Sequence, residues 1–324
     1  MKYVFVCADI SFLTLQYRDF EVKDGYSLVT TPGRSRLFIK ALNIVGLYKV
    51  KALDFMTYSY FDRCFSKLQD KTDIYCFILY SRTYEDFRSI LTRYLRSRYK
   101  GCQIVVYYGD LISRHRFDIS NAKKDADLVC SFDSDDAASN SVEWVLEPFS
   151  ESVVDIDELS PNRNPLIWDV TFVGHAKNRL NKIIEMYELL TESGLKCDFH
   201  ITGVDNKDRV HNDSISYEPL NFMDLLRHVV SSKCILEIMQ DKGVSPTTRY
   251  TEAMLFNRNL LTDCRAFEQD DNCPPNVFYY SNIKNISGKM IEDIAVLHDY
   301  EKEEYVKRFS IDTFIQELRR LLSR

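Results

Sequence analysis

Two segments in the second half of the chain combine residue types suited to binding a phosphorylated ligand. The first, residues 169–180 (DVTFVGHAKNRL), reads as an apolar strand, a turn at Gly174 and a helix that opens around Lys177. Glycine lets the backbone approach a ligand, and a helix start offers unpaired N–H groups to a phosphate. Further donors or charge come from His175, Lys177, Asn178 and Arg179. The alternative is an ordinary strand–helix turn with solvated basic side chains, because one glycine is a weak fingerprint.

The second segment, residues 244–263 (VSPTTRYTEAMLFNRNLLTD), starts with a proline–threonine signal for a helix. Arg249 and Glu252 are three residues apart and therefore share one face of that helix. The Glu252 carboxylate would accept hydrogen bonds from both hydroxyls of a ribose, and Arg249 would face a diphosphate. Thr248 beside them completes the predicted ligand-binding set. The alternative is an ion pair on an exposed helix.

Candidates for a general base lie in the first half of the chain. A base must come within hydrogen-bond reach of the hydroxyl that it deprotonates. In a doubly wound sheet the ligand lies at the carboxyl ends of the strands, so the loops after strands 3–7 and 103–107 are the relevant ones. These loops contain Asp9, Asp110 and His115, and Asp110 in the sequence YYGD is the first choice. The commoner role of such an aspartate is to cap the local backbone.

The sequence Asp133-Ser134-Asp135-Asp136 matches the Asp-X-Asp pattern that binds Mn²⁺ or Mg²⁺ beside a diphosphate. The same residues follow the strand expected at 128–132, where an aspartate is a favoured N-cap of the next helix. We predict the cap and no metal site.

The helix expected over residues 82–100 has a basic side and an aromatic or aliphatic side. The basic residues are Arg93, Arg96 and Lys100, and the apolar ones are Tyr84, Phe87, Leu91 and Leu95. Such a helix can dock on anionic lipid, which makes peripheral membrane contact one interpretation. The alternative is an ordinary amphipathic helix with a solvated basic face.

Short apolar runs alternate with helical patterns along the chain, which predicts an α/β protein with parallel sheets. We expect two Rossmann-like, doubly wound domains that face a cleft: residues 1–150 and residues 169–324, joined by an exposed linker at 151–168. Predicted strands of the first are 3–7, 49–53, 74–79, 103–107, 128–132 and 144–146, with a first helix at 34–45. Those of the second are 170–173, 197–202, 234–238, 259–262 and 277–280.

The composition of the chain limits the classes of partner and the location that we expect for the protein. The net charge of −6 over 324 residues argues against a nucleic-acid backbone as the main partner, which needs a broad positive surface. The nine cysteines are dispersed and several lie in apolar runs, which predicts reduced thiols in a cytoplasmic protein, without disulfides or a zinc site. The start of the sequence has no signal-peptide pattern, and no apolar run is long enough for a membrane span.

The order of these elements resembles the C-terminal nucleotide-binding domain of GT-B glycosyltransferases, and looks most similar to the bacterial capsule and lipopolysaccharide branch. The resemblance covers residues 169–322, including the final segment RFSIDTFIQELRRLL. It implies Glu252 for the ribose of the sugar donor, Arg249 for the phosphates and Gly174 near the donor. The commonest retaining members carry a glutamate eight residues before the ribose glutamate, where this chain has Val244, so retention or inversion stays open.

The resemblance implies metal-independent transfer of a sugar from a nucleotide-sugar to a hydroxyl of a surface glycan or lipid-linked acceptor. The nucleotide-sugar is then a substrate and no cofactor is expected. Nucleic acid is excluded as a partner, and the location is cytoplasmic, at the inner face of the membrane if the basic helix binds lipid. Two alternatives are an epimerase of nucleotide-sugars with the same two domains and a non-catalytic protein that binds sugar nucleotides or glycans.

Overall fold

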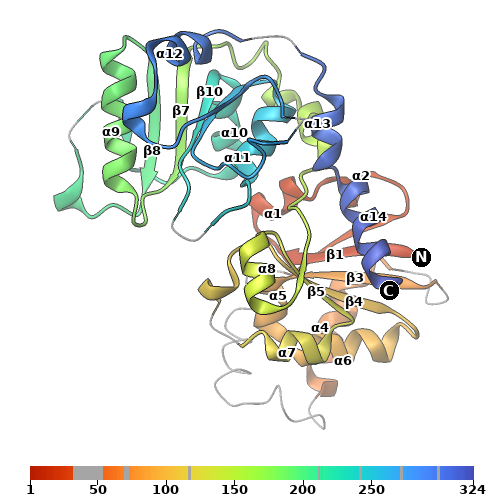
Figure 1. The fold of residues 1–324 in the computed structure, drawn as a ribbon. Coiled ribbons are helices and arrows are strands. Elements are labelled where there is room, and N and C mark those ends of the chain that lie inside the picture. Colours follow the sequence, from red (N-terminus) through yellow and green to blue (C-terminus); the bar gives the residue numbers. More distant parts are fainter. Residues whose placement is uncertain are drawn as a thin grey trace. The chain divides into compact units, whose positions relative to one another are not determined.

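The fold of the chain is seen in a computed structural model (Figure 1). It describes residues 1–31, 54–68, 73–115, 118–210, 212, 214–240, 243–270, 273–297 and 300–324. The predicted helix at 34–45 and strand at 49–53 lie outside the described residues. The chain forms two compact units: unit 1 contains Met1–Ser150 and Ile311–Arg324, and unit 2 contains Glu151–Ser310.

Unit 1 is built on a parallel sheet of six strands in the order β2-β1-β3-β4-β5-β6. Its strands are β1 (Lys2–Ala8), β2 (Tyr26–Thr31), β3 (Tyr75–Tyr80), β4 (Gln103–Tyr108), β5 (Leu128–Ser131) and β6 (Glu143–Trp144). The strand β2 was not expected from the sequence. The central strands β3 and β4 are apolar along nearly their whole length because helices cover both faces of the sheet.

The two faces of this sheet have separate apolar cores. One core contains side chains of α4 (Asp54–Cys64), α5 (Ser81–Phe87) and α6 (Ser89–Arg98). The other contains side chains of α1 (Ser11–Gln16), α2 (Asp19–Val22) and α14 (Ile311–Leu322). The remaining helices are α7 (Ser120–Asp125) and α8 (Ser134–Asn140).

The final helix α14 belongs to unit 1, whereas the sequence placed it in the second domain. Its apolar stripe, which includes Ile311, Phe314 and Leu318, is buried against the β1 face of the sheet. Asp312 accepts hydrogen bonds from Lys23 Nζ at 2.9 Å and from the Tyr26 hydroxyl at 2.6 Å. The predicted boundary of 169–324 is therefore corrected: the stripe was identified, but its partner surface, which includes Tyr3 and Tyr107, lies in the first half of the chain.

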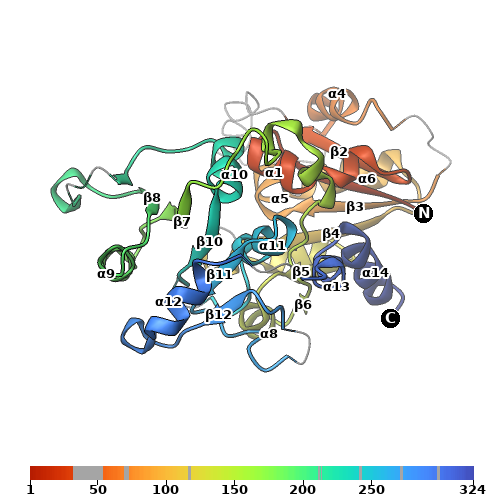
Figure 2. The same ribbon diagram turned by 90° about the horizontal axis from the view of Figure 1, so that it is seen from above.

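Unit 2 repeats the architecture with a parallel sheet in the order β12-β11-β10-β7-β8-β9. The strands are β7 (Trp168–His175), β8 (Cys197–Thr202), β9 (Ile215–Ser216), β10 (Ser232–Glu237), β11 (Asn259–Thr262) and β12 (Val277–Tyr279). The helices are α9 (Leu180–Glu192), α10 (Phe222–Val230), α11 (Thr248–Leu255), α12 (Gly288–Ile294) and α13 (Glu303–Arg308). Figure 2 shows α9 and α12 on one side of the sheet and α10 and α11 on the other.

The predicted linker is not a separate exposed connector. Residues 151–168 are part of unit 2, where Glu151–Asp155 and Asp157–Leu159 form short 3-10 turns. The Ile167 amide donates to the Ser231 carbonyl at 2.9 Å, so the segment is tied to the end of α10 before β7 begins. The Ser, Asn and Pro residues of this segment are those of a chain that turns repeatedly.

The predicted helix at 82–100 is two helices, because the chain breaks at Arg88, whose φ is 49°. The apolar residues proposed for lipid contact, Tyr84, Phe87, Leu91 and Leu95, are buried in the core of unit 1. These four side chains are therefore not available for lipid contact while unit 1 is folded. In the part of the chain that the structure describes, no helix has the length and apolar character needed to span a membrane.

Candidate functional site

The carboxyl ends of β7 and β10 mark the point in unit 2 where the strand order reverses. From β7 the chain continues to β8 and β9 on one side of the sheet, and it then returns to place β10, β11 and β12 on the other. In open α/β sheets such a switch point leaves a crevice in which ligands bind. The predicted ligand-binding residues follow these two strands, so the fold brings both sequence segments together.

Gly174 lies inside β7 and not at the turn that the sequence predicted. The helix α9 starts at Leu180, and Lys177 instead takes a left-handed conformation with φ of 46°. A Cβ on Gly174 would lie 3.3 Å from Nη2 of Arg179. The glycine therefore gives room to the Arg179 guanidinium, which donates to the carbonyls of Ile238 and His175.

The side chains after β7 reach across to β8 and β10. Lys177 Nζ donates to Gln240 Oε1 at 2.7 Å, and His175 Nδ1 lies 2.9 Å from Thr202 Oγ1. His175, Lys177 and Asn178 are exposed at this edge, whereas Arg179 is partly buried and bonded to backbone carbonyls. These contacts make Arg179 a link between strand ends, and they leave His175 and Lys177 as the solvent-facing basic groups.

Arg249 and Glu252 form the predicted pair on α11, and it is not an exposed ion pair. Thr247 caps the helix by accepting from the Arg249 amide at 3.3 Å, as the sequence indicated. The Arg249 guanidinium donates to Glu252 Oε2 and, at 3.1 Å, to the Val173 carbonyl of β7. Thr248, the first residue of α11, is partly buried.

Glu252 is fully buried, and its Oε1 has no hydrogen-bond partner among the described residues. Burial raises the pKa of this carboxyl, and the neighbouring Arg249 opposes the rise. An unpaired buried carboxylate oxygen is costly, and native structures normally satisfy such atoms. A ligand hydroxyl at this position would satisfy it.

Two carboxylates that were not predicted from the sequence accept hydrogen bonds from residues around the end of β10 and the start of α11. Glu237, fully buried at the end of β10, accepts from Thr247 Oγ1 at 2.5 Å and from Thr262 Oγ1 at 2.6 Å. Asp263 accepts from the Met239 amide at 2.5 Å. Burial raises the pKa of both groups. The signal for Glu237 was available, because it is the single charged residue inside the apolar run ILEIM.

The predicted bases of unit 1 have different surroundings. Asp9 is exposed just after β1. Asp110 Oδ1 accepts from the Leu111 amide at 2.9 Å and pairs with Arg114 Nη1 at 2.8 Å, which is the capping role given as its alternative. Asp133 is the N-cap of α8 and accepts from the Asp136 amide at 3.1 Å, so the predicted cap is confirmed.

His115 directly follows the 3-10 turn Ile112–Arg114 after β4. Its side chain is 10% exposed, its Nδ1 lies 3.0 Å from Glu85 Oε1, and its ring packs edge-on against Tyr108 with centroids 5.0 Å apart. These contacts describe a packed histidine with an acidic partner. Its selection as a base stays a prediction, made for a ring that has little contact with solvent.

Glu147, after β6, is a further carboxylate at the same edge of the unit 1 sheet as Asp110. Its Oε1 lies 3.5 Å from the Tyr17 hydroxyl and only 2.8 Å from where a Cβ on Gly109 would be. Burial raises the pKa of Glu147 to about 8, the hydrogen bond with Gln16 opposes the rise, and the charge of Asp110 adds to it. A carboxyl with a raised pKa near the carboxyl ends of parallel strands is a candidate for a catalytic acid or base.

Several known structures with similar folds are glycosyltransferases. An α-glucosyltransferase in complex with UDP and DNA containing an HMU base superposes with a TM-score of 0.65 at 12% identity, over 100% of this chain and 99% of that one. AviGT4, a glycosyltransferase of avilamycin A biosynthesis, gives 0.57 at 10% identity over 100% and 98%, and a glycosyltransferase from Rickettsia africae gives 0.53 at 10% over 99% and 98%. No protein-family model and no curated protein matches the sequence. The predicted fold, two Rossmann-like units of GT-B type, is confirmed.

The same comparison corrects one prediction. Nucleic acid was excluded as a partner from the net charge of −6, yet the α-glucosyltransferase with this fold was solved with DNA bound. The exclusion was wrong because total charge does not describe the local field at a binding surface.

Proposed function

We propose that the protein is a glycosyltransferase that takes a sugar from a nucleoside-diphosphate sugar and transfers it to an acceptor hydroxyl. The observation that carries the proposal is the pair on α11 at the switch point of unit 2. Glu252 is buried with Oε1 unpaired, and Arg249 is fixed by its bond to the Val173 carbonyl. Enzymes of the same fold have been solved with UDP, which supports a uridine nucleotide as the first donor to test.

In this proposal the Glu252 carboxylate binds the ribose hydroxyls of the donor. Arg249 has N–H groups beyond those donated to Glu252 and Val173, because a guanidinium has five. Those groups, with His175 and Lys177 at the exposed edge, bind the diphosphate. Positive charge at this position stabilises the diphosphate as it leaves, which is the step where negative charge develops.

The acceptor hydroxyl needs a base, and Glu147 is our choice over the predicted Asp110. The Asp110 carboxylate already accepts from Arg114 and from the Leu111 amide, so it is engaged within its own loop. Glu147 has no cationic partner among its described contacts, and its pKa of about 8 makes its ionised form a stronger base. Asp110 then acts on Glu147 through its negative charge.

We keep the predicted metal independence as part of the proposal. The support is that Arg249, His175 and Lys177 supply positive charge at the proposed donor site, and that Asp133 of the Asp-X-Asp pattern is buried as a helix cap. Transfer should therefore continue in the presence of a chelator, and loss of transfer in EDTA with recovery in Mg²⁺ would contradict this.

For the acceptor we propose a hydroxyl of a surface glycan or lipid-linked saccharide, from the resemblance in the sequence. A hydroxyl of a modified DNA base is the second candidate, and the DNA-bound α-glucosyltransferase of the same fold favours it. Transfer of radiolabelled sugar to oligosaccharide and to hydroxymethylated DNA, measured side by side, decides between the two.

The donor site is tested by measuring UDP binding with calorimetry for Arg249→Ala and Glu252→Gln. Loss of a hydrogen bond to a charged group costs about 1.5–3 kcal/mol, so we expect about 10–100-fold weaker binding. Arg265→Ala is the matched control, because Arg265 and Glu268 form another ion pair three residues apart in the same unit. Unchanged UDP affinity in both site variants would refute the proposed donor site.

A further inference from the structure

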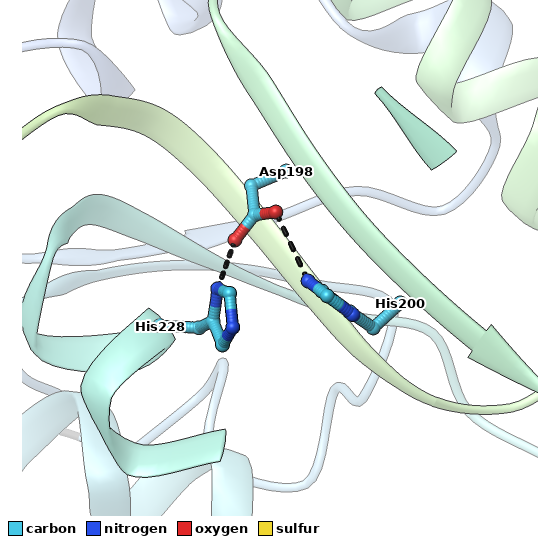
Figure 3. A group of neighbouring side chains, drawn as sticks. All are labelled: Asp198, His200 and His228. Atoms are coloured by element: carbon cyan, nitrogen blue, oxygen red, sulfur yellow. Dashed lines mark hydrogen bonds and ion pairs between the residues drawn. The ribbon is translucent and has the colours of Figure 1, made fainter. Parts of the chain in front are cut away.

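Three side chains that can bind a metal ion meet on the α10 side of the unit 2 sheet (Figure 3). Asp198 and His200 are two residues apart on β8 and therefore project from the same face of the strand. His228 reaches them from the last turn of α10. Asp198 lies between the two imidazoles, with Oδ1 at 3.1 Å from His200 Nε2 and Oδ2 at 2.6 Å from His228 Nδ1.

We propose that Asp198, His200 and His228 bind one Zn²⁺ ion. One ligand atom from each residue lies within 4.8 Å of the other two. Tetrahedral zinc with bonds of about 2.0–2.2 Å places its ligand atoms roughly 3.3–3.5 Å apart, so movements of the side chains by about 1 Å would form the site. Two imidazoles and one carboxylate are a zinc ligand set, with water as the fourth ligand.

The contacts within the cluster do not satisfy all of its polar atoms. Nδ1 of His200 is buried without a hydrogen-bond partner among the described residues, which a closed hydrogen-bond network would avoid. The carboxylate of Asp198 is 10% exposed and the ring of His228 is 28% exposed. The cluster is therefore in contact with solvent mainly through His228.

The site lies apart from the proposed donor residues but is connected to them by β8. Thr202, two residues beyond His200 on the same strand, contacts His175 through its hydroxyl. Zinc would join β8 to α10 close to the edge of the sheet, where β9 has only two residues. We infer a structural ion that fixes this edge of unit 2, outside the chemical step. The positions of the cysteines could not predict this site, because the proposed ligands of the ion are histidine and aspartate.

The proposal is tested on the full chain after dialysis against a chelator, without any assay of transfer. Zn²⁺ is titrated by calorimetry, and Co²⁺ is added as a spectroscopic probe, because tetrahedral Co²⁺ has intense visible absorption bands. The variant is the double substitution His200→Gln and His228→Gln, whose amides can still donate to Asp198 but bind zinc poorly. Arg227→Ala is the control, since Arg227 neighbours His228 on α10 and contacts Asp224 only at the surface.

We expect one Zn²⁺ per chain in the wild type and the Arg227→Ala variant, with tetrahedral Co²⁺ bands and a higher melting temperature with zinc. The double variant should bind at least about 100-fold more weakly, more than is lost when only an outer partner of a ligand is removed. Its circular dichroism spectrum without metal should match the wild type, which shows that it is folded. No stoichiometric binding, or equal binding by the double variant, would overturn the proposal and leave a hydrogen-bonded triad.

Discussion

Replacing Glu147 by glutamine should stabilise unit 1 at neutral pH while it stops transfer. Burial raises the pKa of Glu147 from 4.5 to about 8. For a carboxyl with a raised folded-state pKa, the folded state favours the protonated form, so its contribution to stability is complete below pH 4.5 and is lost as pH rises to about 8. Glutamine does not titrate, so the variant does not lose this stability as the pH rises.

The magnitude follows from the size of the shift. Each pKa unit corresponds to about 1.4 kcal/mol, so between pH 4.5 and pH 7 the ceiling on the loss is about 3 kcal/mol. Partial contact of the side chain with solvent lowers that figure. We expect the free energy of unfolding of Glu147→Gln, relative to wild type, to increase by about 1–3 kcal/mol as the pH rises from 5 to 7.5.

The assay is urea unfolding followed by tryptophan fluorescence. The two tryptophans are Trp144 in unit 1 and Trp168 in unit 2, so a Trp168→Phe background reports on unit 1 alone. Glu143→Gln is the control, because Glu143 is an exposed glutamate four residues earlier. If the difference between Glu147→Gln and wild type is the same at pH 5 and pH 7.5, the argument from burial is refuted.

The same variant tests the proposed base. Removing a general base should lower the rate of transfer about 10²–10⁴-fold. The wild-type rate should rise with pH up to about 8, because only the ionised Glu147 accepts the proton. Asp110→Asn removes a nearby negative charge, so the rising limb should move to lower pH. A rate independent of pH between 6 and 8 would exclude Glu147 as the base.

Other predictions concern positions that hold these sites. Gly109→Ala should destabilise unit 1 by about 1–3 kcal/mol, because the new Cβ would lie 2.6 Å from the Tyr80 ring; Gly288→Ala, where a Cβ meets no atom within 4 Å, should leave the melting temperature unchanged or higher. Glu237→Ala removes the buried acceptor that bonds Thr247 at the start of α11 and Thr262 of β11. We expect weaker UDP binding and, in urea unfolding, a free energy of unfolding of unit 2 that is lower by about 2–4 kcal/mol. Unchanged UDP affinity in a folded Glu237→Ala protein would show that α11 is positioned without it.

The sequence was sufficient where a residue's role depends on local spacing. Arg249 and Glu252 are paired because helical periodicity puts them on one face, and Asp133 caps α8 because it directly precedes the helix. The alternation of strands and helices similarly predicts two parallel sheets, although β2 was missed.

The sequence was insufficient where the role depends on distant partners. Glu147 is defined by Tyr17 and Gly109, which are 130 and 38 positions away, and nothing near it in sequence marks it as buried. The acidic partner of His115 is Glu85, which lies 30 positions earlier and is not indicated by the residues around His115. Gly174 was assigned a turn because it follows an apolar strand and precedes a helical pattern. Its place beside the Arg179 guanidinium, which donates to the Ile238 carbonyl, depends on a contact about 60 positions away.

The position of α14 has a consequence for synthesis of the chain on the ribosome. Unit 1 is interrupted in sequence, since Ile311–Arg324 completes a core that starts at β1, whereas unit 2 is one continuous segment. During translation unit 2 can fold as soon as Ser310 has emerged, while the first 150 residues still expose the face that α14 will cover. The order of folding is therefore expected to be the reverse of the usual N-terminal-first order. The half that emerges first would depend longest on chaperones.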